Sequence, residues 1–343
     1  MMANASQQHC FNFGALRFRR RASSLQELCR NVLVASRSLP QWKALLERCP
    51  ERVRRRALLF SVAHFNGCAI NFCLQRHFSD SDHLSYWVTC SLDRKGYMAV
   101  RASNHRPDRL LDDDEFWHWA RLDHHHVLSV LAVAINAPGC QVHLVTLFPD
   151  DGLEHFARIL TLRTLCIREP HLWKFLHQLC SALLYLQGQG LTVEPFDFFN
   201  VYLRRTNLVL NNSLVWNQRH FEVTSLPGSL WSLLQPPDNF AAIYSAMSTA
   251  DRNQAGAFSV AVVVAQLVAL SLNTSDSTVA ADRRRCGPGS AVELKRIHGI
   301  ELVPAPCVYG QQLASTLSEM LWSPQSTLET MRDRTGAMYA SMI

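Results

Sequence analysis

Histidine residues cluster at one place in the sequence and raise the question of a metal site. Three adjacent histidines, His124 to His126, follow His118, and imidazole is a common zinc ligand. Adjacent residues in a turn point their rings in different directions, and no cysteine or carboxylate set completes a tetrahedral site. The spacing therefore favours a structural turn over a zinc site.

Other candidate reactive groups also have simpler structural explanations. Cys68 has no histidine or visible helix N-terminus beside it that would favour a reactive thiolate. Asp113 and Asp114 open a predicted helix, where the helix dipole favours negative charge. The sequence contains no G-x-S-x-G elbow, which argues against a Ser–His–Asp hydrolase. None of these groups predicts an enzyme by itself.

A loop with the shape of a catalytic loop is indicated by residues 178–203, QLCSALLYLQGQGLTVEPFDFFNVYL. Apolar residues recur at helical spacing over 179–186, and Gly188 and Gly190 then predict a turn. A short polar loop that contains Asn200 leads into an apolar run typical of a strand. What this loop does depends on the elements around it.

The surrounding elements change from strand-rich to helix-rich along the chain. Strands are expected over 57–65, 69–78, 84–92, 97–103, 127–135 and 141–148, with a short helix over 112–122 among them. Longer helices are expected over 152–166, 170–187, 255–272 and 309–322. The predicted fold class is α+β, with a small antiparallel β lobe that carries one helix and a larger, mainly helical lobe.

This order and several local sequences resemble the eukaryotic protein kinase family over about residues 57–335. Segment 115–133 is similar to the kinase helix whose glutamate precedes a Leu-x-His-Pro-Asn-Ile turn, and Glu115 lies nine positions before His124, as in the family. Segment 171–191 resembles the long helix before the catalytic loop in NIMA-related and other Ser/Thr kinases. Further similar segments are the strand, hinge and helix at 142–160 and the large-lobe helices at 258–270 and 311–331.

The resemblance implies a two-lobed kinase-like fold and a vestigial nucleotide cleft. Its parts would be a basic tail with helices at 1–56, an N-lobe at 57–148, a C-lobe at 149–335 with a mobile loop at 273–300, and a tail at 336–343. The cleft positions would be Gly67 in a glycine-rich loop at 63–71, Arg101 in place of the phosphate lysine, Glu115 of the helix, Leu147 of the hinge and Asn200 of the catalytic loop.

The chemistry of phosphoryl transfer is lost at the matching positions. The His-Arg-Asp triplet falls on Val193, Glu194 and Pro195, and proline cannot act as a base. The following lysine is replaced by Asp197, a reversal of charge. Asn200 survives, either as a metal ligand or as a residue that holds the loop. The metal-binding aspartate is replaced by Asn212 or Ser213, neither of which brings a negative charge to Mg²⁺.

Three functions follow from this pattern. The first is a pseudokinase without catalytic residues, metal site or cofactor, which scaffolds or allosterically regulates a partner protein. The second is an atypical ATP-binding Ser/Thr kinase with residual phosphotransfer activity, in which Arg101, Glu115 and Asn200 hold ATP with Mg²⁺ and Glu194 or Asp197 acts as base. The third is an unrelated α+β interaction protein that lacks a hinge at 147–149.

Composition narrows the environment and the partners. Eleven cysteines without a C-x-x-C pair are typical of a reducing compartment, so cytoplasm or nucleus is expected, although the arginine-rich N-terminus also fits a mitochondrial presequence. No apolar run reaches the roughly 18 residues of a transmembrane helix. Basic clusters at 17–21, 51–56 and 282–286 are not part of a recognised nucleic-acid-binding motif, which disfavours nucleic acid. Candidate partners are an active kinase, a cell-cycle or cytoskeletal complex, and a ubiquitin-pathway protein.

Overall fold

Two compact units make up the chain. The computed structural model describes residues 34, 37–70, 85–102, 110–136, 141–191, 196, 200–211, 252–272, 295–304, 309–323 and 327–343. Of these, the first unit holds the residues up to 123 and 128–148, and the second holds 124–127 and the residues from 149 onward. Helices and strands are both abundant, which confirms the α+β class.

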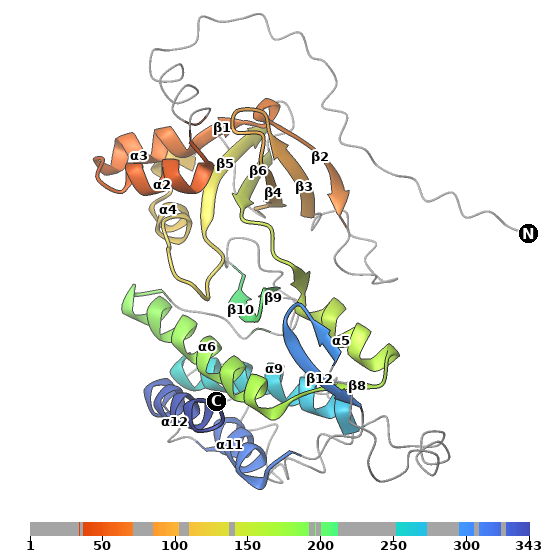
Figure 1. Cartoon of the computed structure of the whole chain (residues 1–343). Coiled ribbons are helices and arrows are strands. Elements are labelled where there is room, and N and C mark those ends of the chain that lie inside the picture. The colour runs from red at the N-terminus through yellow and green to blue at the C-terminus, as the bar shows by residue number, and fades with distance from the viewer. Residues whose placement is uncertain are drawn as a thin grey trace, which may run out of the picture. The chain divides into compact units, whose positions relative to one another are not determined.

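The first unit is built on a six-stranded sheet (Figure 1). Its strands are β1 (Leu59–Ser61), β2 (Phe65–Ile70), β3 (Ser85–Cys90), β4 (Gly96–Arg101), β5 (Val130–Asn136) and β6 (Gln141–Thr146). They lie in the order β1-β5-β6-β4-β3-β2, and every pair is antiparallel except β1 with β5. Tyr97 to Val100 in β4 are all buried, so β4 is covered on both faces and lies in the interior of the sheet.

The start of this sheet differs from the prediction. Residues 57–65 were expected to form one strand of an antiparallel meander, but α3 (Glu51–Leu58) extends through the first two of them. Strand β1 is short and parallel to β5. It ends because the Ser61 hydroxyl accepts a hydrogen bond from the Ala63 N–H at 3.3 Å, which opens the 3₁₀ turn η1 (Val62–His64). The hydrogen bond between the Ser61 side chain and the nearby backbone thus ends the strand inside the apolar run 57–65, which the sequence pattern predicts as one strand.

Three short helices lie beside the sheet in the first unit: α2 (Leu39–Leu46), α3 and α4 (Asp114–Ala120) (Figure 1). Pro40 occupies the first turn of α2, and the Leu39 N–H donates to Asp93 Oδ2 at 3.1 Å, so the β3–β4 turn holds the helix start. The side chain of Asp113 caps α4 by accepting from the Phe116 N–H at 2.8 Å. The 3₁₀ turn η3 (Leu110–Asp112) precedes α4.

The second unit is mainly helical. Its helices are α5 (Leu153–Leu162), α6 (Glu169–Gly188), α9 (Arg252–Leu272), α11 (Gln311–Trp322) and α12 (Leu328–Ser341). Nearly all side chains of α9 from Ala257 to Ala269 are buried, so α9 is a central helix of this unit. Gly256 lets α6 approach α9 closely, because a Cβ there would lie 3.1 Å from Leu183 Cδ1. Among the helices of the described residues, none is long and apolar enough to cross a membrane.

Two three-stranded sheets complete the second unit. One has the order β10-β9-β7, formed by β10 (Asn207–Leu210), β9 (Val201–Arg204) and β7 (Asp151–Gly152), and the other has the order β11-β12-β8, formed by β11 (Lys295–Ile297), β12 (Ile300–Pro304) and β8 (Leu165–Ile167). The prediction of a mobile loop over 273–300 is wrong for its last residues, because β11 begins at Lys295 and forms a hairpin with β12. Residues 273–294 lie outside the described residues. The hairpin turn has positive φ at His298 and Gly299, as two-residue hairpins require.

Helix α12 is the second feature of this unit that differs from the prediction. Residues 336–343 were expected to be a tail, but α12 runs to Ser341 and packs on α6 (Figure 1). Leu328, Met331 and Thr335 of α12 are buried. The His177 ring of α6 donates from Nδ1 to the Arg332 carbonyl at 3.0 Å. These contacts make the C-terminal helix part of the core.

Candidate functional site

Arg101 lies at the end of β4, on a face of the sheet that also carries two aromatic rings. The register pairs Tyr86 with Ala99 and Arg101 with His143. Residues two apart in a strand and residues directly paired across strands point to the same face, so Tyr86, Arg101 and His143 share one face. Tyr86 is 8% exposed, His143 is 3% exposed, and their ring centroids lie 5.8 Å apart in an edge-to-face arrangement. Two buried rings therefore occupy the surroundings of Arg101.

The rings beside Arg101 are electrically neutral at pH 7. Burial, with a smaller contribution from the positive charge of Arg101, lowers the pKa of His143 to about 4. Burial also raises the pKa of Tyr86, against the opposite effect of Arg101. A water-accessible phosphate site needs room beside its cation. Arg101 itself is half-buried, and its two neighbours on this face are neutral core rings.

The other cleft positions predicted in the first unit do not converge on Arg101. Glu115 lies in the first turn of α4, is exposed, and makes no ion pair with any described residue. Gly67 lies inside β2, paired with Val88, so residues 65–70 form a strand where a glycine-rich loop was expected. Leu147 follows β6 directly and is half-buried. Strand β2 continues through Gly67 because every residue from Phe65 to Ile70 pairs with β3. The apolar strand pattern thus outweighs the turn signal of the Asn66-Gly67 pair.

Asn200 lies at the base of the β9–β10 hairpin in the second unit. Asn200 and Asn211 are both buried, and the Asn200 carbonyl accepts from the Asn211 N–H at 2.7 Å. The register of the hairpin thus brings Asn211 beside Asn200. Asn212 and Ser213, which the resemblance matches to the metal-binding aspartate, lie outside the described residues. Glu194, Pro195 and Asp197 also lie outside them. The residue next to Asn200 is an amide and brings no charge to a metal.

The histidine run has structural partners within the second unit. His124 stacks on Tyr185 with ring centroids 4.6 Å apart, and Nδ1 of His126 approaches the Leu208 carbonyl at 3.1 Å. Burial lowers the pKa of His126 to about 4. Across the described residues, no group of three or more histidine, cysteine or acidic side chains is arranged to hold a metal ion. The turn interpretation of this run therefore agrees with the structure better than a zinc site.

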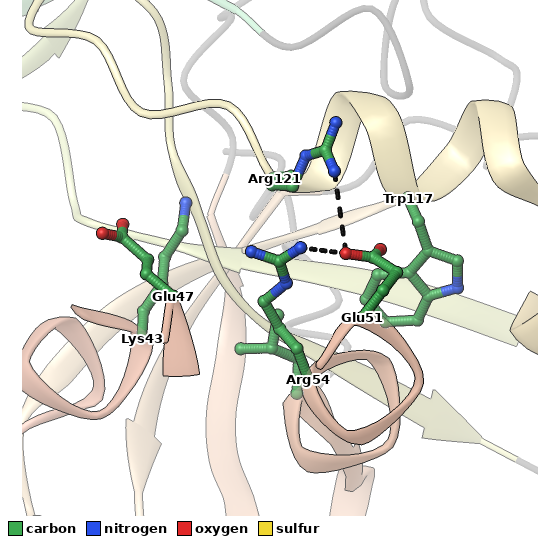
Figure 2. Close-up of a pocket in the computed structure, with 7 residues that line it drawn as sticks. Lys43, Glu47, Glu51, Arg54, Trp117 and Arg121 are labelled. Carbon is green, nitrogen blue, oxygen red and sulfur yellow. Dashed lines mark hydrogen bonds and ion pairs between the residues drawn. The ribbon is translucent and has the colours of Figure 1, made fainter. Parts of the chain in front are cut away.

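A charged cavity that the sequence did not reveal lies among α2, α3 and α4 (Figure 2). It has a volume of about 280 Å³ and is lined by Lys43, Glu47, Glu51, Arg54, Leu58, Trp117 and Arg121. Figure 2 shows the guanidinium groups of Arg54 and Arg121 pointing toward the Glu51 carboxylate. Side chains from three helices meet here, and only packing of the first unit brings them together.

Lys43 is the unusual group in this cavity, because it is only 7% exposed. Its Nζ donates to the Leu122 carbonyl at 2.9 Å. Burial lowers the pKa of Lys43 to about 8, while Asp123 and Glu47 act in the opposite direction. Its position in PQWKALL is that of an ordinary helix lysine, so the sequence contains no signal for its burial.

Comparison with known proteins adds no family to these observations. No protein-family model matches the chain, and no curated protein matches its sequence.

Proposed function

We propose that the chain is a kinase-like module that transfers no phosphate and acts by binding an acidic protein partner. The first unit supports this proposal by its order of elements, because the strand that carries Arg101 is followed by α4, then β5 and β6. The family resemblance implies this order of lysine strand, glutamate helix and two further strands. The division between the two units after Phe148 is consistent with a hinge at 147–149.

The observation that carries the non-catalytic part is the pair of buried rings beside Arg101. Phosphoryl transfer depends on a cation and metal ions that contact the phosphates, and nearly all of its rate comes from this positioning and charge neutralisation. Tyr86 and His143, two neutral core rings, share the sheet face of Arg101. Glu115, which would orient the cation, is exposed and makes no ion pair with any described residue. In the part of the chain that the structure describes, the cation position therefore has apolar ring neighbours and lacks the glutamate partner that phosphoryl transfer uses.

The second unit supports the same proposal at the metal position. In active kinases an aspartate and an asparagine hold the two Mg²⁺ ions. Here the hairpin brings two asparagines together, Asn200 and Asn211, and an amide is a weaker ligand for Mg²⁺ than a carboxylate. Atypical ATP-dependent activity would need this site to hold Mg²⁺ without the charge that normally attracts it.

The binding part of the proposal rests on the charge of α2 and α3. Seven basic and two acidic residues lie between Arg37 and Leu58, so this stretch has a net charge of +5, whereas the whole chain has +6. Arg37, Arg48, Arg52 and Arg56 are exposed and make no ion pair with any described residue. Two of these arginines flank α2 and two lie on α3, and together they create a positive potential that attracts acidic surfaces.

A groove on α2 gives this basic face a specific shape. Its volume is about 560 Å³, and it is lined by Arg37, Gln41, Ala44, Leu45 and Arg48. Leu45 is 40% exposed and lies in α2, whereas Arg37 precedes this helix and Arg48 follows it. A segment with an apolar residue between two acidic ones would match this arrangement in both charge and polarity. We therefore identify the partner class as a protein with an acidic segment of this type.

Charge reversal of the groove should test this partner class. A fluorescein-labelled peptide in which glutamates flank one leucine is expected to bind the intact protein, measured by fluorescence anisotropy at low and high salt. The double variant Arg37→Glu/Arg48→Glu should weaken binding at least tenfold, because two attractive pairs become repulsive. The salt dependence should decrease in the same variant.

The matched control is Arg163→Glu/Arg204→Glu, which changes the net charge equally at two exposed arginines of the second unit. This control should bind the peptide as the wild type does. An equal loss of affinity in both double variants would show that only net charge matters, and would contradict a groove on α2.

A further inference from the structure

The cavity among α2, α3 and α4 contains more hydrogen-bond donors than its own acceptors use. The Lys43 ammonium has three N–H donors, and among the described residues only the Leu122 carbonyl accepts one of them. Arg121 has five donors, and its one ion pair with a described residue is with Glu51 at 3.6 Å, longer than a hydrogen bond. Donors of this kind in a cavity indicate room for an acceptor from outside the chain.

The Glu51 carboxylate does not depend on Arg121. Arg54 Nη2 contacts Glu51 Oε2, and Arg55 Nε donates to Glu51 Oε1 at 3.0 Å, so both carboxylate oxygens already have a closer partner. Arg55 is itself fixed by Asp114 Oδ1 at 2.6 Å and by the Leu111 carbonyl at 3.0 Å. Arg121 is 47% exposed and can turn toward a ligand without leaving Glu51 unpaired.

Cations in this cavity lie close enough to disfavour one another. Burial lowers the pKa of Arg54, and the positive charges of Arg121 and Arg55 lower it further. Arg54 in turn lowers the pKa of Lys43. At Lys43, however, the carboxylates of Asp123 and Glu47 favour the charged form more than Arg54 disfavours it. The lining as a whole has three cationic side chains, Lys43, Arg54 and Arg121, against the two carboxylates Glu47 and Glu51. An anionic ligand would balance the remaining positive charge.

We propose that this cavity binds a phosphate group, with Lys43, Arg54 and Arg121 as its ligands. Two guanidiniums and an ammonium provide the forked and single donors that phosphate oxygens accept. A volume of about 280 Å³ holds a phosphate with a small organic group, and Leu58 and Trp117 provide an apolar side for that group. The site is separate from the groove on α2, so it extends the proposed function rather than resting on it.

Glu47 allows a test in which the proposal predicts a gain of affinity. It lines the same cavity, is exposed, and makes no ion pair with any described residue. Its negative charge opposes an incoming phosphate, so removal of this charge in Glu47→Gln should tighten binding several-fold. A variant that gains affinity is informative because damage to the fold cannot produce it.

Isothermal titration calorimetry on the full chain should measure the affinity for three probes: inorganic phosphate, O-phosphoserine and a peptide that carries one phosphoserine. Arg121→Gln should weaken binding about tenfold and Lys43→Met more than that, because Lys43 lies inside the cavity. Arg163→Gln is the matched control, since Arg163 is exposed in the second unit and does not line the cavity. It should bind as the wild type does.

The outcomes separate the sources of the phosphate. Binding of all three probes indicates a site for small phosphates, and binding of the peptide alone identifies a phosphorylated partner as the source. Both results support the site if Arg121→Gln weakens the binding and Glu47→Gln strengthens it. No heat with any probe, or the same loss in Arg163→Gln as in Arg121→Gln, would overturn the proposal and would leave the kinase-like, non-catalytic proposal unaffected.

Discussion

Met331→Ala is expected to reduce the free energy of unfolding of the second unit by about 2–5 kcal/mol, the usual cost of a large-to-small change in a core. Met331 is fully buried in α12, Leu328 is buried one turn earlier beside Gly256 of α9, and the His177–Arg332 hydrogen bond joins α12 to α6. Urea unfolding followed by circular dichroism measures this change. A loss of this size would show that the buried face of α12 belongs to the core.

Met342→Ala is the matched control, because Met342 is 38% exposed just after the end of the same helix. It should change the free energy of unfolding by less than about 0.5 kcal/mol. If Met331→Ala were as mild as Met342→Ala, α12 would not be packed on α6 as the structure has it.

Acid should destabilise the first unit through His143. The pKa of His143 is about 4 in the folded chain, whereas an unfolded histidine titrates near 6.5. As the pH falls from about 6.5 to about 4, the unfolded chain binds a proton that the folded chain excludes, so stability is present at neutral pH and decreases over this window. His143 alone should account for roughly 2–3 kcal/mol of this loss.

His143→Phe keeps a ring beside Tyr86 and removes the titrating group, so the loss of stability between pH 6.5 and 4 should be smaller by that amount. Urea unfolding at several pH values in this range provides the measurement. His125→Gln, at an exposed histidine, should follow the wild type. A pH dependence that is identical in His143→Phe and the wild type would mean that His143 is not buried as a neutral ring.

The sequence predicts the elements best where local signals and burial agree. Strand β4, helix α6 and helix α9 lie close to the expected ranges because each has an uninterrupted apolar pattern. Helix α4 is shorter than the predicted 112–122, since Asp113 caps it and the preceding residues form a 3₁₀ turn. The C-terminal helix α12 was missed because only three of its side chains, spaced over two turns, are buried.

The candidate sites depend on pairings that no local pattern contains. That Tyr86 and His143 lie beside Arg101 follows from the register of three strands that are distant in the sequence. The position of Asn211 beside Asn200 follows from a hairpin with a two-residue turn, and a shift of one residue would have placed Asn212 there. The sequence predicts Lys43 as a solvent-exposed lysine, whereas in the fold its Nζ donates to the Leu122 carbonyl, just after α4. Long-range packing, not residue type, defines these sites.

Thermal unfolding of the purified protein with ATP or ADP, each with Mg²⁺ or with EDTA, tests the central claim most directly. A ligand that binds only the folded state stabilises it by about 2.7 kcal/mol at a hundred times its Kd, which is readily seen as a rise in Tm. Because two neutral core rings share the face of Arg101 and Glu115 makes no ion pair with any described residue, we expect no rise with either nucleotide, in the wild type or in Arg101→Lys. A Mg²⁺-dependent rise with ATP would contradict the non-catalytic proposal and would favour an atypical kinase.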